Sequence, residues 1–437
     1  MNKQHILQQI VREQKSGCPA AICSVCSAHP LVIEAAIDKG VADGSVVLIE
    51  ATANQVNQYG GYTGMKPDDF GRFVRRIARE RGLPPDRLIL GGDHLGPLVW
   101  QKEDESTALP QAAELIRQYV LTGCGKIHID TSMHLGNDPR DQRLPILTGA
   151  ERAARLAQAA ADAFADRQIN EGPEADSPVF VIGSEVPIPG GSQTDEALQV
   201  TATDDLRATI SGFQDAFARQ GISRIFAQVI AVVVQPGVEF GDSLIHAYDR
   251  TAARQLTRYM QSQPGLVLEG HSTDYQQTDH LRQMAEDGVA ILKVGPALTF
   301  ALREGLLALE HIEKALSAEN RQVVLSHFAE TLDEAMLRNP VYWQNHYHGS
   351  EAEQRLARMF SLSDRCRYYL GEADVAAAID RLLYNLRPQI IPLPLLSQYL
   401  PDQYRLVREN LLLPEPRELL KSKVRQEIAR YPAFRAQ

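Results

Sequence analysis

Polar residues stand at the ends of successive short apolar segments in the first 295 residues of the chain. These residues are Glu50, Asp93-His94, Asp130, Glu185, Gln235, His271 and Lys293. If the segments are parallel strands of one closed sheet, their carboxyl ends meet at one mouth, where barrel enzymes keep their active sites. His, Asp and Glu together can bind a metal ion or transfer protons. The concentration of such residues predicts an enzyme site more strongly than any one of them.

Two histidines and a carboxylate on different segments offer the donor atoms that divalent metal ions prefer. We predict His94, Glu185 and His271 as metal ligands, with one coordination position left open for substrate. Gln235 is a weaker fourth ligand, and it fits a hydrogen-bonded structural role equally well. The expected cofactor is a divalent ion, zinc first, with nickel, cobalt, manganese or magnesium as alternatives.

Two carboxylates are predicted as catalytic groups. Asp93 directly precedes a predicted ligand, so the alternation of side chains along a strand leaves open whether it enters the mouth. If it does, it can serve as an acid and base. Glu185 is predicted to combine ligation with catalysis, and Glu50 and Asp130 are predicted to contact substrate.

An anion site is predicted beyond the last two strands. The segments GHSTDYQ and KVGPALTF each open an expected helix, whose first amides and dipole favour an anion. Barrels often hold a phosphate at this place. The predicted substrate or phosphate contacts are Ser272, Thr273, Asp274 and Lys293. In the alternative reading, Ser272 or Thr273 only caps a helix and Lys293 lies on the surface. No GxxxxGK[ST] sequence is present, which argues against a P-loop kinase.

The elements that must position these residues repeat in a regular order along the chain. Short β-branched segments alternate with amphipathic segments that are typical of crossover helices. The expected strands are residues 21–26, 46–51, 87–94, 126–130, 179–185, 229–235, 266–271 and 290–295. Eight strands with seven crossovers predict an α/β protein with a (β/α)₈ barrel. A doubly wound nucleotide-binding sheet would show a glycine fingerprint after its first strand, and AICSVCSAHP contains no glycine.

The pattern changes after residue 300, where helical segments accumulate and prolines interrupt them. We predict a barrel over residues 1–315 and a helical extension over residues 316–437 that packs on it. The extension could mediate assembly or cover the barrel mouth.

Composition excludes several classes of partner. The net charge of −10 lacks the basic excess that a general nucleic-acid binder needs. No segment reaches the roughly 18 uninterrupted apolar residues of a membrane span, and the first residues lack a signal-peptide core. Five cysteines in 437 residues fit a reducing compartment. We therefore expect a cytoplasmic protein with no nucleic-acid or membrane partner.

Several long motifs resemble a known family. They are ICSVCSAHPLVIEAA, LIEATANQVNQYGGYTGM, LGGDHLGP, EVPIPGG, VVVQPGVEF, HSTDYQ, ILKVGPALTFALRE and SQYLPDQY. They closely resemble the Z-type, so-called non-catalytic, subunit family of tagatose-bisphosphate aldolase, nearly end to end. The resemblance implies either a stabilising partner of the catalytic class II aldolase subunit or a metal-dependent C4 epimerase acting on ketoses, ketose 6-phosphates or uronates. Older labels for some members name a tagatose-6-phosphate kinase, but this sequence shows no ATP site.

A more distant similarity is to the class II aldolases themselves. Their pattern has an Asp-His pair after strand three, a glutamate after strand five and metal-binding histidines after strands six and seven. Asp93, His94, Glu185 and His271 match that pattern position by position. Gln235 departs from it, because a neutral glutamine carbonyl stands where the aldolases have histidine.

The chemistry of ketoses favours the epimerase. The C4 hydrogen of a 2-ketose is not acidified by the carbonyl, so inversion at C4 requires the C3–C4 bond to break and form again. A Lewis-acidic metal and a base for the C4 hydroxyl would suit this reaction. We predict a metal-dependent C4 epimerase of fructose-type and tagatose-type ketoses or their 6-phosphates. The alternative is a non-catalytic subunit that binds and stabilises the class II tagatose-1,6-bisphosphate aldolase, and a homo-oligomer is a further expected assembly.

Overall fold

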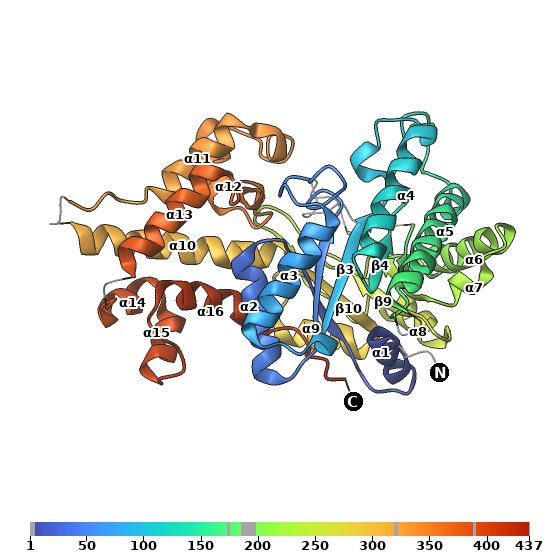
Figure 1. Cartoon of the computed structure of the whole chain (residues 1–437), viewed down its shortest axis with the longest axis horizontal. Coiled ribbons are helices and arrows are strands. Elements are labelled where there is room, and N and C mark those ends of the chain that lie inside the picture. Colours follow the sequence, from blue (N-terminus) through green and yellow to red (C-terminus); the bar gives the residue numbers. More distant parts are fainter. Residues whose placement is uncertain (1–4, 173–174, 185–197, 319–321, 388–389, 437) are drawn as a thin grey trace.

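The computed structural model describes residues 5–172, 175–184, 198–318, 322–387 and 390–436 (Figure 1). Eight parallel strands close into a barrel, with the last strand paired to the first. In spatial order they are β1 (Ile22–Cys26), β2 (Val47–Thr52), β3 (Leu88–Leu95), β4 (Lys126–Ile129), β5 (Val179–Ile182), β6 (Val229–Val234), β9 (Val267–Gly270) and β10 (Val289–Val294). Each lies within or overlaps one predicted strand, so the predicted (β/α)₈ barrel is confirmed.

Helices connect the strands and surround the barrel. They are α2 (Pro30–Asp43), α3 (Pro67–Arg81), α4 (Glu105–Leu121), α5 (Ile146–Glu171), α6 (Thr203–Arg219), α7 (Ser223–Phe226), α8 (Arg254–Ser262) and α9 (Thr278–Glu286). A small hairpin, β7 (Glu239–Phe240) and β8 (Ile245–His246), follows β6. No helix in the described ranges is long and apolar enough to cross a membrane.

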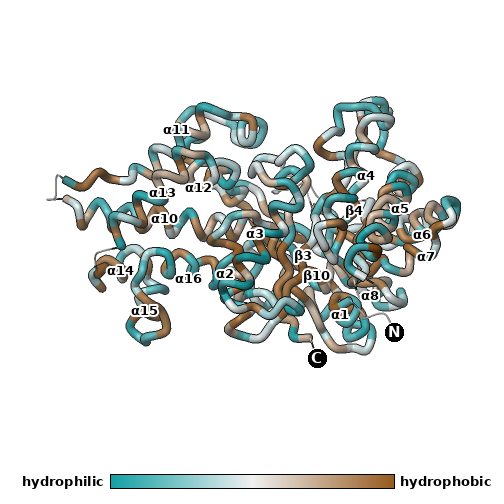
Figure 2. The backbone as a smooth tube through the Cα atoms, viewed as in Figure 1, coloured by the Kyte–Doolittle hydropathy of each residue, from teal (hydrophilic) through white to brown (hydrophobic). Residues whose placement is uncertain are grey.

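Side chains alternate between the two faces of every barrel strand, as the pleat requires. On β4, Ile127 and Ile129 belong to the hydrophobic layer between strands and helices, so Lys126 and His128 face the barrel interior. At the amino-terminal end of the barrel the interior is apolar, and helix α1 (Ile6–Lys15) contributes Leu7 and Ile10 to it. Figure 2 shows hydrophobic residues gathered along the strands around β3 and β10.

The chain after β10 forms the helical extension, which spreads away from the barrel in Figure 1. Its helices are α10 (Pro296–Ser317), α11 (Phe328–Arg338), α12 (Glu351–Phe360), α13 (Ala373–Leu386), α14 (Leu393–Tyr399), α15 (Pro401–Arg408) and α16 (Pro416–Ile428). Helix α10 begins at the barrel and runs past the predicted boundary at residue 315. The chain end returns to the barrel, where Phe434 joins the apolar interior and its carbonyl accepts the Val46 N–H at 2.8 Å.

A buried ion pair joins α10 to the segment after α12. Arg303 is 1% exposed, and its Nε donates to Asp364 Oδ1 at 2.8 Å. Thr299 Oγ1 donates to the other carboxylate oxygen at 2.6 Å. Because both charges are out of water, each depends on the other for compensation.

We therefore expect Asp364→Ala to lower the free energy of unfolding by about 3–5 kcal/mol, because it leaves the Arg303 guanidinium buried without a counter-charge. Asp402→Ala is the control, since it removes an exposed pair with Arg405 and should cost less than about 1 kcal/mol. Urea denaturation followed by circular dichroism measures both. Equal losses for the two variants would contradict the expectation.

Candidate functional site

Three histidine rings meet at the mouth of the barrel. His94 comes from β3, His128 from β4, and His271 directly follows β9. Their ring centroids lie 4.9–5.1 Å apart in all three pairs, and all three side chains are buried. A ligand atom from each ring and one from the Asp93 carboxylate all lie within 4.8 Å of one another. We call the three rings the histidine triangle, and their donor atoms suit a divalent metal ion.

Each ring of the histidine triangle is held by a carboxylate on one of its nitrogens. The contacts are His94 Nδ1 to Asp130 Oδ2 at 2.8 Å, His128 Nδ1 to Asp93 Oδ1 at 2.9 Å, and His271 Nε2 to Glu269 Oε1 at 3.0 Å. A carboxylate only accepts, so the ring nitrogen beside it carries the proton and the other nitrogen presents its lone pair. Metal-binding histidines are usually oriented in this way.

One ring nitrogen provides a test of whether a metal fits. His128 Nε2 is fully buried and has no hydrogen-bond partner in the described part of the chain. The backbone N–H of His94 also approaches His128 Nδ1, at 3.1 Å, but the ionised Asp93 is the stronger partner of that nitrogen. An orphaned buried nitrogen is costly unless it binds something. The residues therefore fit a divalent metal ion.

A bulge in β3 brings two consecutive residues into the site. Gly92 pairs with Ile127 and Leu95 with Ile129, so β3 carries one residue more than β4 between these pairs. The extra residue falls at Asp93-His94, and His94 takes a φ of 48°. Strict alternation would send one of the two side chains outward, and the bulge lets both reach the mouth. This settles the question that alternation left open for Asp93.

A layer of buried charges lies beneath the histidine triangle. We call it the charged layer, and it consists of Glu50, Asp93, Lys126, Glu269 and Lys293. Lys126 Nζ lies 2.8 Å from both Glu50 Oε1 and Glu269 Oε2. Lys293 Nζ lies 3.1 Å from Glu50 Oε2 and also contacts Asp93. Gly91 faces this layer because a Cβ there would overlap the Glu50 carboxylate.

The pairing in the charged layer keeps Asp93, Glu269 and the two lysines ionised. Burial alone would raise the pKa of Glu269, but Lys126 and Lys293 outweigh it and hold that pKa well below its ordinary value. Burial is likewise outweighed at Asp93, where His94 and Lys293 lower the pKa. The pKa of each lysine is raised, because nearby carboxylates outweigh the burial that would lower it.

The charges around the histidine triangle do not cancel. Four carboxylates, Glu50, Asp93, Asp130 and Glu269, stand against the two lysines of the charged layer, which leaves an excess of two negative charges in the described residues. The excess affects His94, whose pKa is raised by Asp93 and Asp130 against the effect of burial. Burial lowers the pKa of His271 to about 3, so that ring stays neutral. A divalent cation would restore neutrality.

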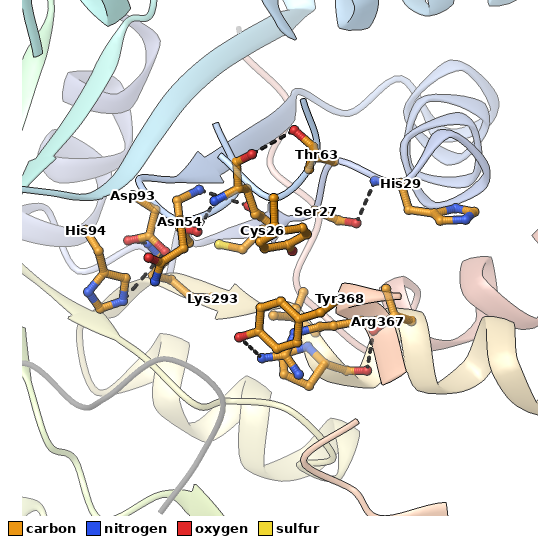
Figure 3. A pocket seen from close by; sticks show the side chains of 18 of the residues that line it. Cys26, Ser27, His29, Asn54, Thr63, Asp93, His94, Lys293, Arg367 and Tyr368 are labelled. Carbon is orange, nitrogen blue, oxygen red and sulfur yellow. Dashed lines mark hydrogen bonds and ion pairs between the residues drawn. The ribbon is translucent and has the colours of Figure 1, made fainter. Parts of the chain in front are cut away.

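The histidine triangle borders a cavity of about 320 Å³, within the size range of small-ligand sites. Asp93, His94, His271 and Lys293 line its floor. Other walls come from the segment after β1 and from the helical extension. Figure 3 shows Arg367 and Tyr368 of the extension across the cavity from Ser27 and Thr63.

The predicted metal ligands have different places in the structure. His94 and His271 are brought together in the histidine triangle. Gln235 Oε1 accepts hydrogen bonds from the backbone N–H groups of Gly237 and Val238, at 2.9 and 3.0 Å, so its carbonyl is engaged in a turn. Glu185, predicted both as ligand and as catalytic group, lies outside the described residues.

The predicted substrate contacts are also divided. Ser272, Asp274 and Lys293 line the cavity, whereas Glu50, Asp130 and Thr273 are buried and do not. Thr273 Oγ1 donates to the Lys293 carbonyl at 2.6 Å. Asp274 Oδ1 accepts the N–H groups of Gly295 and Ala297, at 3.0 and 2.8 Å. The first amides of α10, where we expected a phosphate, therefore already bind a carboxylate of the protein.

Sequence reasoning missed several residues of the site. His128 could have been found, because in the segment KIHID it shares one strand face with Asp130, two residues away. Glu239, buried beside Ser272, was also missed, and burial raises its pKa to about 7. Arg367 and Tyr368 had no local signal, since they reach the cavity only through the packing of the extension.

Known proteins provide an independent comparison. The family described as D-tagatose-1,6-bisphosphate aldolase subunit GatZ/KbaZ-like matches residues 7–435. A probable tagatose 6 phosphate kinase from Sinorhizobium meliloti 1021, known from a crystal structure, is 43% identical with a TM-score of 0.85, covering 94% of this chain and 99% of that chain. Fructose-bisphosphate aldolase from Campylobacter jejuni is 13% identical with a TM-score of 0.43, covering 87% of this chain and 91% of that chain. The family match confirms the resemblance seen in the motifs, and this chain belongs to the D-tagatose-1,6-bisphosphate aldolase subunit GatZ/KbaZ-like family.

Proposed function

We propose that this protein is a metal-dependent C4 epimerase that interconverts fructose-type and tagatose-type ketoses or their 6-phosphates. The observation that carries the proposal is the histidine triangle, in which a carboxylate holds every ring and two of the rings, those of His94 and His271, line a sugar-sized cavity. His94, His128 and His271 would hold the divalent ion. When bound, such an ion supplies Lewis-acid polarisation of the ketose carbonyl.

Epimerisation at C4 is proposed to proceed by cleavage and re-formation of the C3–C4 bond. A base takes the proton of the C4 hydroxyl, and the O–H electron pair forms the C4 carbonyl of an aldehyde. The C3–C4 electron pair moves to C3 and is delocalised onto the C2 oxygen as an enediolate. Rotation of the aldehyde presents its other face, and re-addition returns the proton to the C4 oxygen. Atoms and electrons balance without any further reactant.

Asp93 is the proposed base. Its carboxylate lines the cavity, is ionised, and is held in place by His128 and Lys293. The Lys293 ammonium adds positive charge beside the position where the enediolate would form. Glu185 stays a proposed second carboxylate. Gln235 stays a proposed fourth ligand, and its carbonyl would have to release two backbone hydrogen bonds to bind an ion.

The purified protein alone should convert fructose 6-phosphate to tagatose 6-phosphate when supplied with zinc, nickel, cobalt, manganese or magnesium. Treatment with a chelator should abolish the conversion, and readdition of the ion should restore it, because the proposed Lewis acid is then replaced. Chromatography of the sugar phosphates measures the product. The proposal is wrong if neither fructose 6-phosphate nor fructose gives any product with any of these metals.

An accessory role in an aldolase is the rival function, and the description of the family favours it. In that case the chain should co-purify with a class II aldolase and should raise that enzyme's activity without making any epimer itself. The same assay therefore separates the two functions.

Graded losses of metal affinity should follow changes at the histidine triangle. Asp130→Asn removes the carboxylate that orients His94 and should weaken metal binding about 10–100-fold. His128→Ala removes a ligand and should weaken it more. His348→Ala, at an exposed histidine of the extension, is the matched control. Competition with a chromophoric chelator measures the affinities, and a His128→Ala protein that binds metal like the control would exclude His128 as a ligand.

Metal affinity should also fall as the pH falls. The pKa of His94 is raised, so below that pKa a proton competes with the metal for its ring. One competing proton lowers the apparent affinity about tenfold per pH unit, and the loss ceases above the His94 pKa. Zinc titrations between pH 6 and pH 8.5 measure this dependence. A pH-independent affinity across that range would contradict it.

A further inference from the structure

Two arginines of the extension surround one tyrosine ring beside the cavity. They lie in the short turn η4 (Arg365–Tyr368), directly after the buried Asp364, which pairs with Arg303 of α10. The guanidinium carbon of Arg367 lies 4.4 Å from the centroid of the Tyr368 ring, and that of Arg365 lies 6.0 Å away. These contacts place both positive charges beside Tyr368, and of the two arginines Arg367 lines the cavity together with Tyr368.

Neither charge is paired with a carboxylate. In the described part of the chain no Asp or Glu oxygen lies within 4.0 Å of the Arg365 or Arg367 guanidinium. Arg365 is buried and Arg367 is half-buried, whereas the buried arginines nearby are paired, Arg303 with Asp364 and Arg358 with Asp333. A positive charge withdrawn from water without a counter-charge costs free energy. An anion in the cavity would recover it.

Arg367 keeps hydrogen-bonding capacity for such an anion. Its Nη1 donates to the carbonyls of Ser363 and Asp364, at 2.6 and 2.9 Å, and its Nη2 donates to the Tyr368 hydroxyl at 2.9 Å. A guanidinium has five N–H groups. Within the described ranges this leaves one N–H on Nε and one on Nη2 without a partner. Two such neighbouring N–H groups match two oxygens of a phosphate.

The opposite pole of the cavity offers a phosphate no unpaired cation, because Lys293 there is paired with Asp93. Its floor carries the ionised Asp93 beside the histidine triangle, and the amides of α10 are taken by Asp274. Burial raises the pKa of Asp274 to about 6, although the N–H groups of Ala297 and Gly295, and to a smaller extent Arg367, act to lower it. In the described residues no oxygen of Asp274 lies within 4.0 Å of the Arg367 guanidinium. Among the cavity-lining residues that the structure describes, Arg367 is the cation that has no carboxylate oxygen within 4.0 Å, whereas Lys293 is paired with Asp93.

We propose that Arg367 binds the terminal phosphate of a ketose 6-phosphate whose carbonyl end lies at the histidine triangle. The identity of the ketose rests on the proposed function, whereas the phosphate site stands on the geometry of Arg367. The extension thereby selects phosphorylated ketoses over neutral ones.

The test compares fructose 6-phosphate, fructose and inorganic phosphate as ligands of the full-length, metal-loaded protein by titration calorimetry. In Arg367→Gln the affinity for fructose 6-phosphate and for inorganic phosphate should fall about 10- to 100-fold, while that for fructose stays unchanged. Arg367→Lys keeps the positive charge but not the paired N–H groups of the guanidinium, so its affinity for fructose 6-phosphate should fall less. Arg338→Gln, which breaks an exposed pair with Glu372 and Asp374, is the control and should bind like the wild type.

Circular dichroism checks that each variant folds, because Arg367 also bonds two carbonyls of its own turn. If Arg367→Gln does not fold, the comparison of Arg367→Lys with the wild type carries the test. A ratio of fructose 6-phosphate to fructose affinity that is unchanged in the folded variant overturns the inference. So does a wild-type protein that binds fructose 6-phosphate no better than fructose.

The binding readout separates this inference from the proposed function. If the wild type binds fructose 6-phosphate through Arg367 but forms no tagatose 6-phosphate, the epimerase fails and the phosphate site stands. If the wild type forms product and Arg367→Gln keeps the same ratio of kcat/KM for the two sugars, the site fails and the epimerase stands.

Discussion

The structure of the mouth depends on the ion pairs of Lys126, which lies inside the barrel with no exposed surface. An ammonium in that position is tolerated only because Glu50 and Glu269 each lie 2.8 Å from it. Glu269 then uses its other oxygen to hold His271. Asp93 also contacts a lysine, Lys293, and holds His128, and it does both through Oδ1. Two of the carboxylates that neutralise the buried lysines, Glu269 and Asp93, therefore also orient imidazoles, so a change in the charged layer would also affect the histidine triangle.

The strands were predictable because their physical requirement is local. A strand buried on both faces is largely apolar and β-branched, and polar residues at its carboxyl end can face the mouth. This requirement identified all eight barrel strands, as well as His94 and His271. The same logic applied to inward-facing positions would have added His128. Lys126 and Glu269 were not predicted as site residues. A charge inside an apolar segment is stable only with partners from other strands, and the sequence of one segment does not show which strands it pairs with.

Other features depend on register and on distant packing. The bulge at Asp93-His94 arises from a mismatch of one residue between β3 and β4, which the sequence of neither strand reveals. Arg367 follows β10 by more than 70 residues, and its position depends on the pair of Arg303 with Asp364. We expected the extension to mediate assembly or to cover the mouth. The structure shows it contributing Arg367 and Tyr368 to the cavity wall.

The charges around the cavity favour one orientation of a bound substrate. The buried carboxylates around and beneath the histidine triangle exceed the lysines there by two, and the wall formed by the extension carries Arg367, which has no carboxylate oxygen within 4.0 Å in the described residues. Under the proposed function, a ketose phosphate with its anionic end toward the floor would place a phosphate against Asp93. The reverse orientation pairs the phosphate with Arg367 and leaves the carbonyl end for the cation that the floor attracts. Because a divalent ion and a phosphate carry opposite charges, each binds best at its own pole. The chain length of the sugar between the two poles then determines which carbon–carbon bond lies beside Asp93.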